Sequence, residues 1–207
     1  MTEPFFRIWG RPDSHNVKKV VWFAAELGLA FTRIDMGGSF GFTEEYLAQN
    51  PNRLIPTIAD GKLTLWESNS IVRYMAAEYG GPRWYLADPI DRALAERWMD
   101  WQTGYGAAQK DMYLGLVRTP EEARDTAAIA ASKATCERLL AVLDAQLATT
   151  PWLSGHQIGV GDIAMGPFIH SWFTLAPETA DLPHVHAWYQ RLLERPAYAE
   201  HVALPLS

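Results

Sequence analysis

The feature that most restricts the fold is a change of pattern near residue 80. Before it, short apolar and β-branched runs typical of strands alternate with helical stretches and turn signals. From about residue 89 onward the chain is rich in Ala and Leu, with helical spacing throughout and no convincing strand. We therefore predict an α/β domain over residues 1–80 joined to an all-α domain over residues 88–207.

The expected order in the first domain is β-α-β-α-β-β-α. Strands at 5–9 and 31–35 flank a helix that ends at Gly28, which predicts a right-handed βαβ unit. Asp60-Gly61 between two apolar runs is a strong hairpin signal. In the second domain we expect helices at about 89–117, 120–148, 161–175, 184–194 and 196–204.

Composition excludes several classes of protein. The 207 residues are 48% hydrophobic and 20% charged, which excludes wholesale disorder. A net charge of -6 offers no basis for binding nucleic acid. No run approaches the roughly 20 apolar residues of a membrane span, and no signal peptide precedes the first strand. We expect a cytoplasmic protein without nucleic acid or membrane partners.

Cysteine and histidine usage gives no sign of a metal site. Cys136 is the only cysteine, so an internal disulfide or a Cys-based metal cluster is excluded and a reducing compartment is favoured. Within a helix this thiol is expected to be buried and inert. His184 and His186 are two residues apart and would not share a helical face, so no metal is predicted.

Six short segments follow one another in a characteristic order. They are SHNVK (14–18), NPNRLIP (50–56), WESNSI (66–71), YMA (74–76), GDIAMG (161–166) and a stretch from WY to RPAY (188–198). Each is a weak signal alone, but together they resemble the soluble glutathione transferase superfamily, above all its bacterial theta-like branch with an active-site serine. The resemblance covers nearly the whole chain. It implies a thioredoxin-like glutathione-binding domain followed by a helical domain that contributes the second-substrate site.

The resemblance implies that Ser14, at the start of the first helix, activates the glutathione thiol. A helix N-terminus favours an anion, and a hydroxyl can donate a hydrogen bond to the sulfur. Asn16 lies within the same turn and can donate through its side-chain amide, so it is the alternative main donor. The other interpretation of Ser14 is a helix N-cap alone.

Two further pairs are implied to hold glutathione itself. The proline of the Ile55-Pro56 pair is cis in the family, which turns the preceding backbone outward to pair with an extended tripeptide. Glu67 and Ser68 would bind the γ-glutamyl end, since the start of a helix favours a carboxylate and Glu67 can accept from the ammonium group. Both can also simply cap their own helix.

The sequence departs from the family pattern at Leu54. Many relatives place Lys or Arg there to contact the glycine carboxylate, which Leu54 cannot do. Arg53 and Lys18 are the remaining candidates for this contact, and modest affinity for glutathione is expected.

The second substrate is expected between two aromatic walls. The glycine-rich loop 37–41 would contribute Phe40 and Phe42, and the first long helix would contribute Trp101, Tyr105 and Met112. Tyr113, Phe168 and Trp172 are placed behind this second wall. The alternative for each of these residues is an interdomain or dimer core. Asp162 is predicted to be structural, as a buried carboxylate at the start of a core helix.

The function predicted from these residues is a glutathione transferase. It would use glutathione as co-substrate, without a metal, conjugate it to a small hydrophobic electrophile, and act as a homodimer. The alternatives are a glutathione-dependent disulfide reductase or peroxidase, in which two bound glutathiones do the redox work. A non-catalytic binding protein on the same fold is a third possibility.

Overall fold

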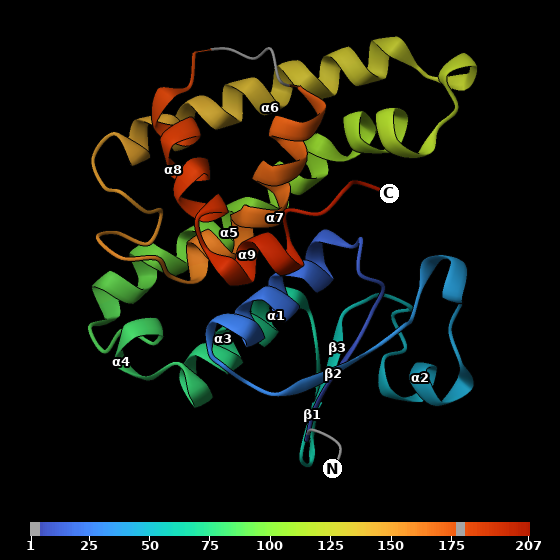
Figure 1. Cartoon of the computed structure of the whole chain (residues 1–207), viewed down its shortest axis with the longest axis vertical. Coiled ribbons are helices and arrows are strands. Elements are labelled where there is room, and N and C mark those ends of the chain that lie inside the picture. The colour runs from blue at the N-terminus through green and yellow to red at the C-terminus, as the bar shows by residue number, and fades with distance from the viewer. Residues whose placement is uncertain (1–4, 177–180) are drawn as a thin grey trace.

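The computed structural model describes residues 5–176 and 181–207, which form a small mixed sheet and a mainly helical C-terminal part (Figure 1). The first part contains β1 (Phe6–Trp9), α1 (His15–Glu26), β2 (Phe31–Ile34), α2 (Glu44–Gln49), β3 (Thr57–Asp60), β4 (Leu63–Trp66) and α3 (Ser68–Tyr79). The second contains α4 (Gly81–Trp84), α5 (Pro89–Tyr113), α6 (Thr126–Leu147), α7 (Val160–Leu175), α8 (Pro183–Leu193) and α9 (Pro196–His201). The predicted fold class is confirmed.

The sheet has four strands in the order β2-β1-β3-β4. β1 pairs parallel with β2 around α1, which confirms the predicted βαβ unit. β3 and β4 form the expected antiparallel hairpin, in which Asp60 faces Leu63. The turn needs Gly61, whose φ of 58° lies in the left-handed region that disfavours other residues.

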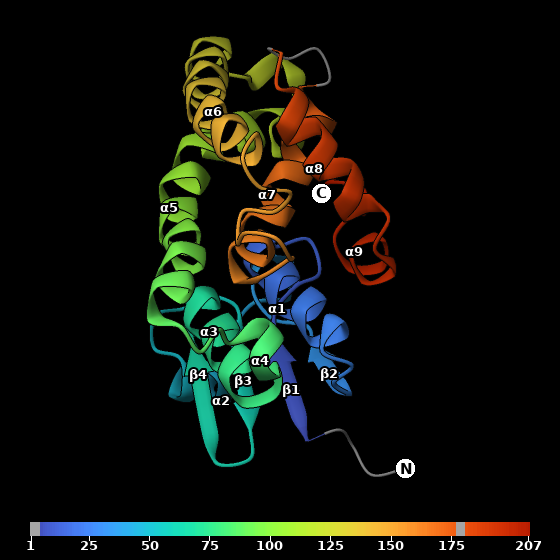
Figure 2. The same ribbon diagram turned by 90° about the vertical axis from the view of Figure 1, so that its left-hand side faces the viewer.

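The two faces of the sheet are covered differently. α2 covers one face with a small cluster formed by Trp9, Met36, Tyr46 and Ala59. On the other face, α1 and α3 lie between the sheet and the helical part (Figure 2). One continuous hydrophobic core therefore runs from the sheet through α1 into α7.

α1 has no solvent face over most of its length. Every residue from Val17 to Ala24 is buried, because α3, α7 and α9 all pack against the helix. α1 is therefore covered on more than one side. It also means that two lysines of this helix, Lys18 and Lys19, are buried.

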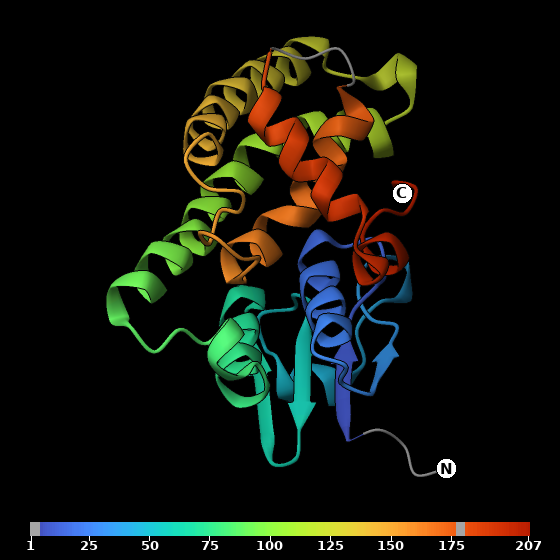
Figure 3. The same cartoon turned by 60° about the vertical axis from the view of Figure 1, so that its left-hand side comes forward.

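The helical part differs from prediction around residues 114–125. α5 and α6 lie side by side as the two longest helices (Figure 3). α5 ends at Tyr113 and is followed by a short π-helical turn, Leu114–Arg118. α6 begins at Thr126 rather than near 120, because Asp125 is its N-cap and accepts a hydrogen bond from the Ala128 N–H at 2.9 Å. Among the described helices, none is long and apolar enough to cross a membrane.

Candidate active site

Ser14 stands immediately before α1 in an extended conformation, with φ -75° and ψ 123°. Its carbonyl accepts the first helical hydrogen bond, from the Lys18 N–H at 2.9 Å. Its hydroxyl makes no capping hydrogen bond to α1. Ser14 is thus the N-cap by backbone position, while its side chain is left available for a ligand.

The Ser14 side chain borders a pocket of about 200 Å³ between α1, α5 and α7. The pocket is lined by Arg11, Asp13, Ser14, His15, Asn16, Gly106, Gln109, Lys110, Tyr113, Leu114, Arg118 and Phe168. Asp13 accepts hydrogen bonds from both Arg11 and Arg118. The cavity next to Ser14 therefore combines aromatic rings with an excess of cationic groups.

His15 is a residue of this pocket that the sequence interpretation missed. Its ring stacks on Phe168 and meets Tyr113 edge-on, each at a centroid distance of 4.7 Å, and its Nε2 contacts the Ser171 hydroxyl. Burial, followed by the positive charges of Lys18 and Lys19, lowers the pKa of His15 to about 3. The imidazole is therefore neutral at physiological pH. In the sequence, His15 is a single histidine between Ser14 and Asn16. Nothing in the neighbouring residues indicates that its ring packs against Phe168 and Tyr113.

A chain of hydrogen bonds connects the start of α1 to the start of α3. The Ser68 hydroxyl donates to Asn16 Oδ1 at 3.2 Å, and Lys19 Nζ donates to Ser68 Oγ at 3.3 Å. Because Asn16 turns its oxygen toward Ser68, its amide N–H groups point away from that bond. The two predicted halves of the site, Ser14 with Asn16 and Glu67 with Ser68, thus come together.

Glu67 lies just before α3 with a positive φ of 72°. Its side chain is exposed and makes no cap hydrogen bond to the helix. A non-glycine residue in this region of backbone space is strained, and such strain is concentrated at functional sites. Capping of α3 therefore does not account for the Glu67 side chain.

The Ile55-Pro56 peptide bond is cis, as predicted. The loop before it is held by Tyr46 and Asn50, whose hydroxyl and amide both donate to the Leu54 carbonyl. The sequence interpretation had assigned these two residues no role. Tyr46 reaches the loop from α2, whereas Asn50 follows the end of α2 and contacts the loop locally.

The two candidate cations for the glycine carboxylate are placed very differently. Leu54 is 60% exposed, and neighbouring Arg53 is also exposed, with a positive φ of 57°. Lys18 is buried and donates to the Val202 carbonyl at 3.1 Å, toward the C-terminal segment. Lys18 therefore does not reach the ligand side of Pro56, and that part of the prediction is wrong. Lys18 and Lys19 are adjacent in α1, and the sequence does not show which neighbouring segment each one meets.

The predicted aromatic wall on α5, Trp101, Tyr105 and Met112, does not line the pocket beside Ser14. Tyr105 and Met112 are fully buried, and Trp101 stacks on Tyr105 at 5.9 Å in the groove toward α6. The residues that line the pocket, such as Gln109 and Tyr113, are offset by one position, or about 100° around the helix. Both faces of α5 are apolar enough to pack, so periodicity alone could not choose between them.

The remaining predicted wall residues are divided. Phe168 lines the pocket, whereas Trp172 is fully buried in the core. Phe40 and Phe42 are exposed, and Phe42 stacks on Tyr46 at 5.5 Å without reaching the lining of the pocket beside Ser14. Within the described residues no group of three or more His, Cys, Asp or Glu side chains could hold a metal ion.

The fold and this site define a class of protein, and comparison identifies it. Residues 9–83 match the family model of the glutathione S-transferase N-terminal domain, and residues 126–191 match that of the C-terminal domain. The chain belongs to the glutathione S-transferase family. This confirms the resemblance seen in the sequence.

Individual relatives narrow the assignment. The glutathione S-transferase GstB of Escherichia coli K12 is 48% identical over 206 residues, covering 97% of this chain and 99% of the relative. A theta class glutathione S-transferase from Xanthomonas axonopodis pv. citri, solved with glutathione bound, is 49% identical with a TM-score of 0.94, covering 99% and 100% of the two chains. The disulfide-bond oxidoreductase YfcG of Escherichia coli K12 is 30% identical, covering 90% of this chain and 88% of YfcG. The protein is a glutathione S-transferase.

Proposed function

We propose that this transferase binds glutathione between the Ile55-Pro56 turn and the start of α3, with its sulfur beside Ser14. The observation that carries this proposal is the free Ser14 hydroxyl at the N-terminus of α1, bordering a pocket. The γ-glutamyl carboxylate would accept from Ser68, and its ammonium group would donate to Glu67. The glutathione-bound Xanthomonas relative supports this ligand for the fold.

Energetics support Ser14 as the activating residue. A free thiol has a pKa of about 8.5, and lowering it by about two units requires roughly 2.7 kcal/mol. The N-terminus of α1 would stabilise a thiolate by up to about 1–2 kcal/mol. A hydroxyl hydrogen bond to the charged sulfur would add about 1.5–3 kcal/mol. Together the two contributions suffice, and the amide of Asn16 is available as a second donor.

The pocket beside Ser14 refines the expected electrophile. Tyr113 and Phe168 offer ring surfaces, which suit a small hydrophobic body. Arg11, Lys110 and Arg118 line the same cavity against the single carboxylate of Asp13. We infer that a small aromatic electrophile with an anionic substituent fits better than a neutral one.

A matched pair of electrophiles tests this inference. Conjugation of glutathione to 4-chloro-3-nitrobenzoate and to 4-chloro-3-nitrobenzamide is measured, and each rate is divided by its uncatalysed rate. We expect the benzoate to be favoured about threefold or more in kcat/KM, as for a partly exposed ion pair of about 0.5–1 kcal/mol. Arg118→Gln should reduce this preference. Equal kcat/KM for both substrates would contradict the inference that an anionic substituent is preferred. If neither substrate were conjugated, the inference that this pocket binds the electrophile would be contradicted.

A disulfide reductase is the second candidate function. The similarity to YfcG, named a disulfide-bond oxidoreductase, favours it. The chain contains one cysteine, Cys136, which is buried in α6, so the redox work would fall to two bound glutathiones. Parallel assays with chlorodinitrobenzene and with a model disulfide would compare the two reactions. Reduction of the disulfide without conjugation of chlorodinitrobenzene would make disulfide reduction the main reaction of this family member.

We also propose a homodimer that works in the cytoplasm. Exposed apolar side chains on α5 and α6, among them Leu94 and Val142, support a further packing surface. A two-fold pair is the commonest soluble assembly. A cytoplasmic location agrees with the buried single thiol and would be tested by cell fractionation.

A further inference from the structure

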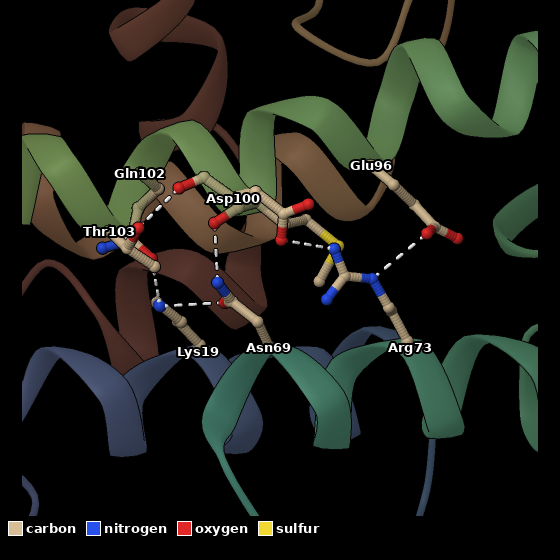
Figure 4. A network of polar contacts seen from close by, with 8 residues as sticks. Lys19, Asn69, Arg73, Glu96, Asp100, Gln102 and Thr103 are labelled. Carbon is tan, nitrogen blue, oxygen red and sulfur yellow. Dashed lines mark hydrogen bonds and ion pairs between the residues drawn. The ribbon is translucent and has the colours of Figure 1, made fainter.

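Lys19 ends in a buried ring of oxygen atoms at the junction of three helices (Figure 4). The side chain comes from α1 and is only 1% exposed. Its Nζ contacts Asn69 Oδ1 at 3.0 Å and the Gln102 Oε1 of α5, as Figure 4 shows. It also contacts Ser68 Oγ at 3.3 Å. The lysine therefore reaches the Ser68 hydroxyl from the interior of the protein.

All three oxygens are oriented as acceptors toward Nζ. The Asn69 amide donates to the Met99 carbonyl at 2.6 Å, which turns its oxygen toward Lys19. The Ser68 proton is donated to Asn16 Oδ1, which leaves the Ser68 oxygen free to accept. Three acceptors match the three N–H groups of an ammonium ion. A neutral amine has two N–H groups, so one acceptor would face its lone pair.

Burial opposes the charge that this arrangement requires. From α7 the Phe168 ring lies 5.3 Å from Nζ, and from α1 the neighbouring titratable groups are His15 and Lys18. The two carboxylates drawn on α5, Glu96 and Asp100, both pair with Arg73. Burial lowers the pKa of Lys19 to about 7, while the charge of Glu67 on α3 acts in the opposite direction. Protonated and neutral Lys19 are therefore both populated near neutral pH.

We propose that Lys19 is a positioning residue for glutathione: its ammonium group holds Ser68 as a hydrogen-bond donor to the ligand, and glutathione binding draws a proton onto Lys19. The inference rests on the proposed role of Ser68 at the γ-glutamyl carboxylate. With its oxygen occupied by Lys19, Ser68 can direct its own proton only outward, to Asn16 or to a bound carboxylate. An anion near Nζ favours the charged amine, which takes its additional proton from the solvent.

The test uses S-methylglutathione, which has no ionisable sulfur. Any proton taken up when it binds therefore cannot come from a change in thiol ionisation. Its binding is measured by calorimetry at pH 7.5 in buffers of different ionisation enthalpy, which gives the protons taken up. The wild-type enzyme should take up a fraction of a proton, and its affinity should fall as pH rises from 6.5 to 8.5 because Lys19 loses its proton over this range. Lys19→Arg stays charged, so it should bind without the uptake and with a flatter pH dependence. Lys19→Met should weaken binding about tenfold, the loss expected for one hydrogen bond to a charged group.

Arg73→Gln is the matched control, because it also removes a contact between α3 and α5. Arg73 joins α3 to α5 through Glu96 and Asp100 (Figure 4). The Ser68 hydroxyl is hydrogen-bonded to Lys19 and Asn16 rather than to Arg73. Arg73→Gln should leave the proton uptake unchanged. Uptake that persists in Lys19→Arg, or no uptake by the wild-type enzyme, would overturn the proposal for Lys19. Failure of the wild-type enzyme to bind S-methylglutathione at all would instead overturn the proposed glutathione site.

Discussion

Ser14 and Asn16 are separated by one residue at the start of α1, and substitution distinguishes their roles. Ser14→Ala should lower kcat by about 10- to 100-fold and raise the pKa seen in the pH-rate profile. Its melting temperature should change little, because the Ser14 hydroxyl makes no cap hydrogen bond. Steady-state kinetics against pH, with a melting curve, measure both effects.

Asn16→Ala is the companion variant. If Ser14 is the main donor, Asn16→Ala should lose less activity than Ser14→Ala. Asn16→Ala also removes the acceptor of the Ser68 hydroxyl, so its main effect is expected in KM for glutathione. A larger loss of kcat in Asn16→Ala would make Asn16 the principal donor.

His15 links the active-site pocket to stability in acid. In the unfolded chain its pKa is about 6.5, whereas burial lowers it to about 3 in the folded protein. Between these values only the unfolded state binds the proton, so stability is complete above pH 6.5 and decreases as pH falls. His15→Phe should reduce the loss between pH 7.5 and 4.5 by on the order of 2 kcal/mol.

Urea denaturation at the two pH values measures this difference. The same substitution at His184, which is exposed on α8, controls for the removal of a histidine. An unchanged pH slope in His15→Phe would mean that the ring is protonated in the folded protein.

At the scale of elements, the start of α7 depends on one carboxylate. Asp162 is fully buried and accepts hydrogen bonds from the N–H groups of Leu153, Ser154 and Gly159 and from the indole of Trp188. Its predicted structural role is supported by these contacts. Asp162→Ala would leave these donors unpaired and should cost about 3 kcal/mol or more. Chemical denaturation measures the loss in the free energy of unfolding. Asp162→Asn keeps one acceptor oxygen, so its stability should lie between that of the wild-type protein and that of Asp162→Ala.

The two faces of α5 should respond differently to substitution. Tyr113 lines the pocket beside Ser14, so Tyr113→Leu should change KM for the electrophile severalfold. Trp101 lies toward α6, so Trp101→Leu should reduce stability and leave that KM unaltered. Kinetics with saturating glutathione test the pair. The reverse result would restore Trp101 to the substrate wall.

At the scale of the whole molecule, we predict that two chains form a homodimer. A chain of 23.3 kDa should elute and scatter light as a particle of twice that mass. The expected contact places the sheet domain of one chain on the helical domain of the other. Light scattering at micromolar concentration measures the mass, and the mass of a single chain would contradict the dimer. The boundary between the two domains near residues 80–88 also stays a prediction, which limited proteolysis can address.

Local signals in the sequence determined most of the fold. Alternating and helical periodicity predicted the element order of the sheet domain, and Asp60-Gly61 predicted the hairpin, because both signals depend on residues adjacent in the chain. The cis bond before Pro56 was implied by the family resemblance of the segment that precedes it. The six family-like segments then identified the class of enzyme. The largest shift of a helix boundary is at 114–125, where a π-helical turn and the cap at Asp125 replace a continuous pattern. In addition, α9 ends at His201 rather than near 204, and the short helix α4 was not predicted.

The directions of buried side chains were decided by tertiary structure alone. α1 is covered on several sides by other elements, so its sequence could not show that Lys18 points to Val202 and Lys19 to Ser68. Likewise, α5 packs against other helices on two faces. Its contacts with these helices place Tyr113 at the pocket beside Ser14 and Trp101 in the groove toward α6. The physical reason is that burying an apolar side chain is about equally favourable against any apolar partner. Which partner a side chain meets depends on contacts between elements that are distant in the chain.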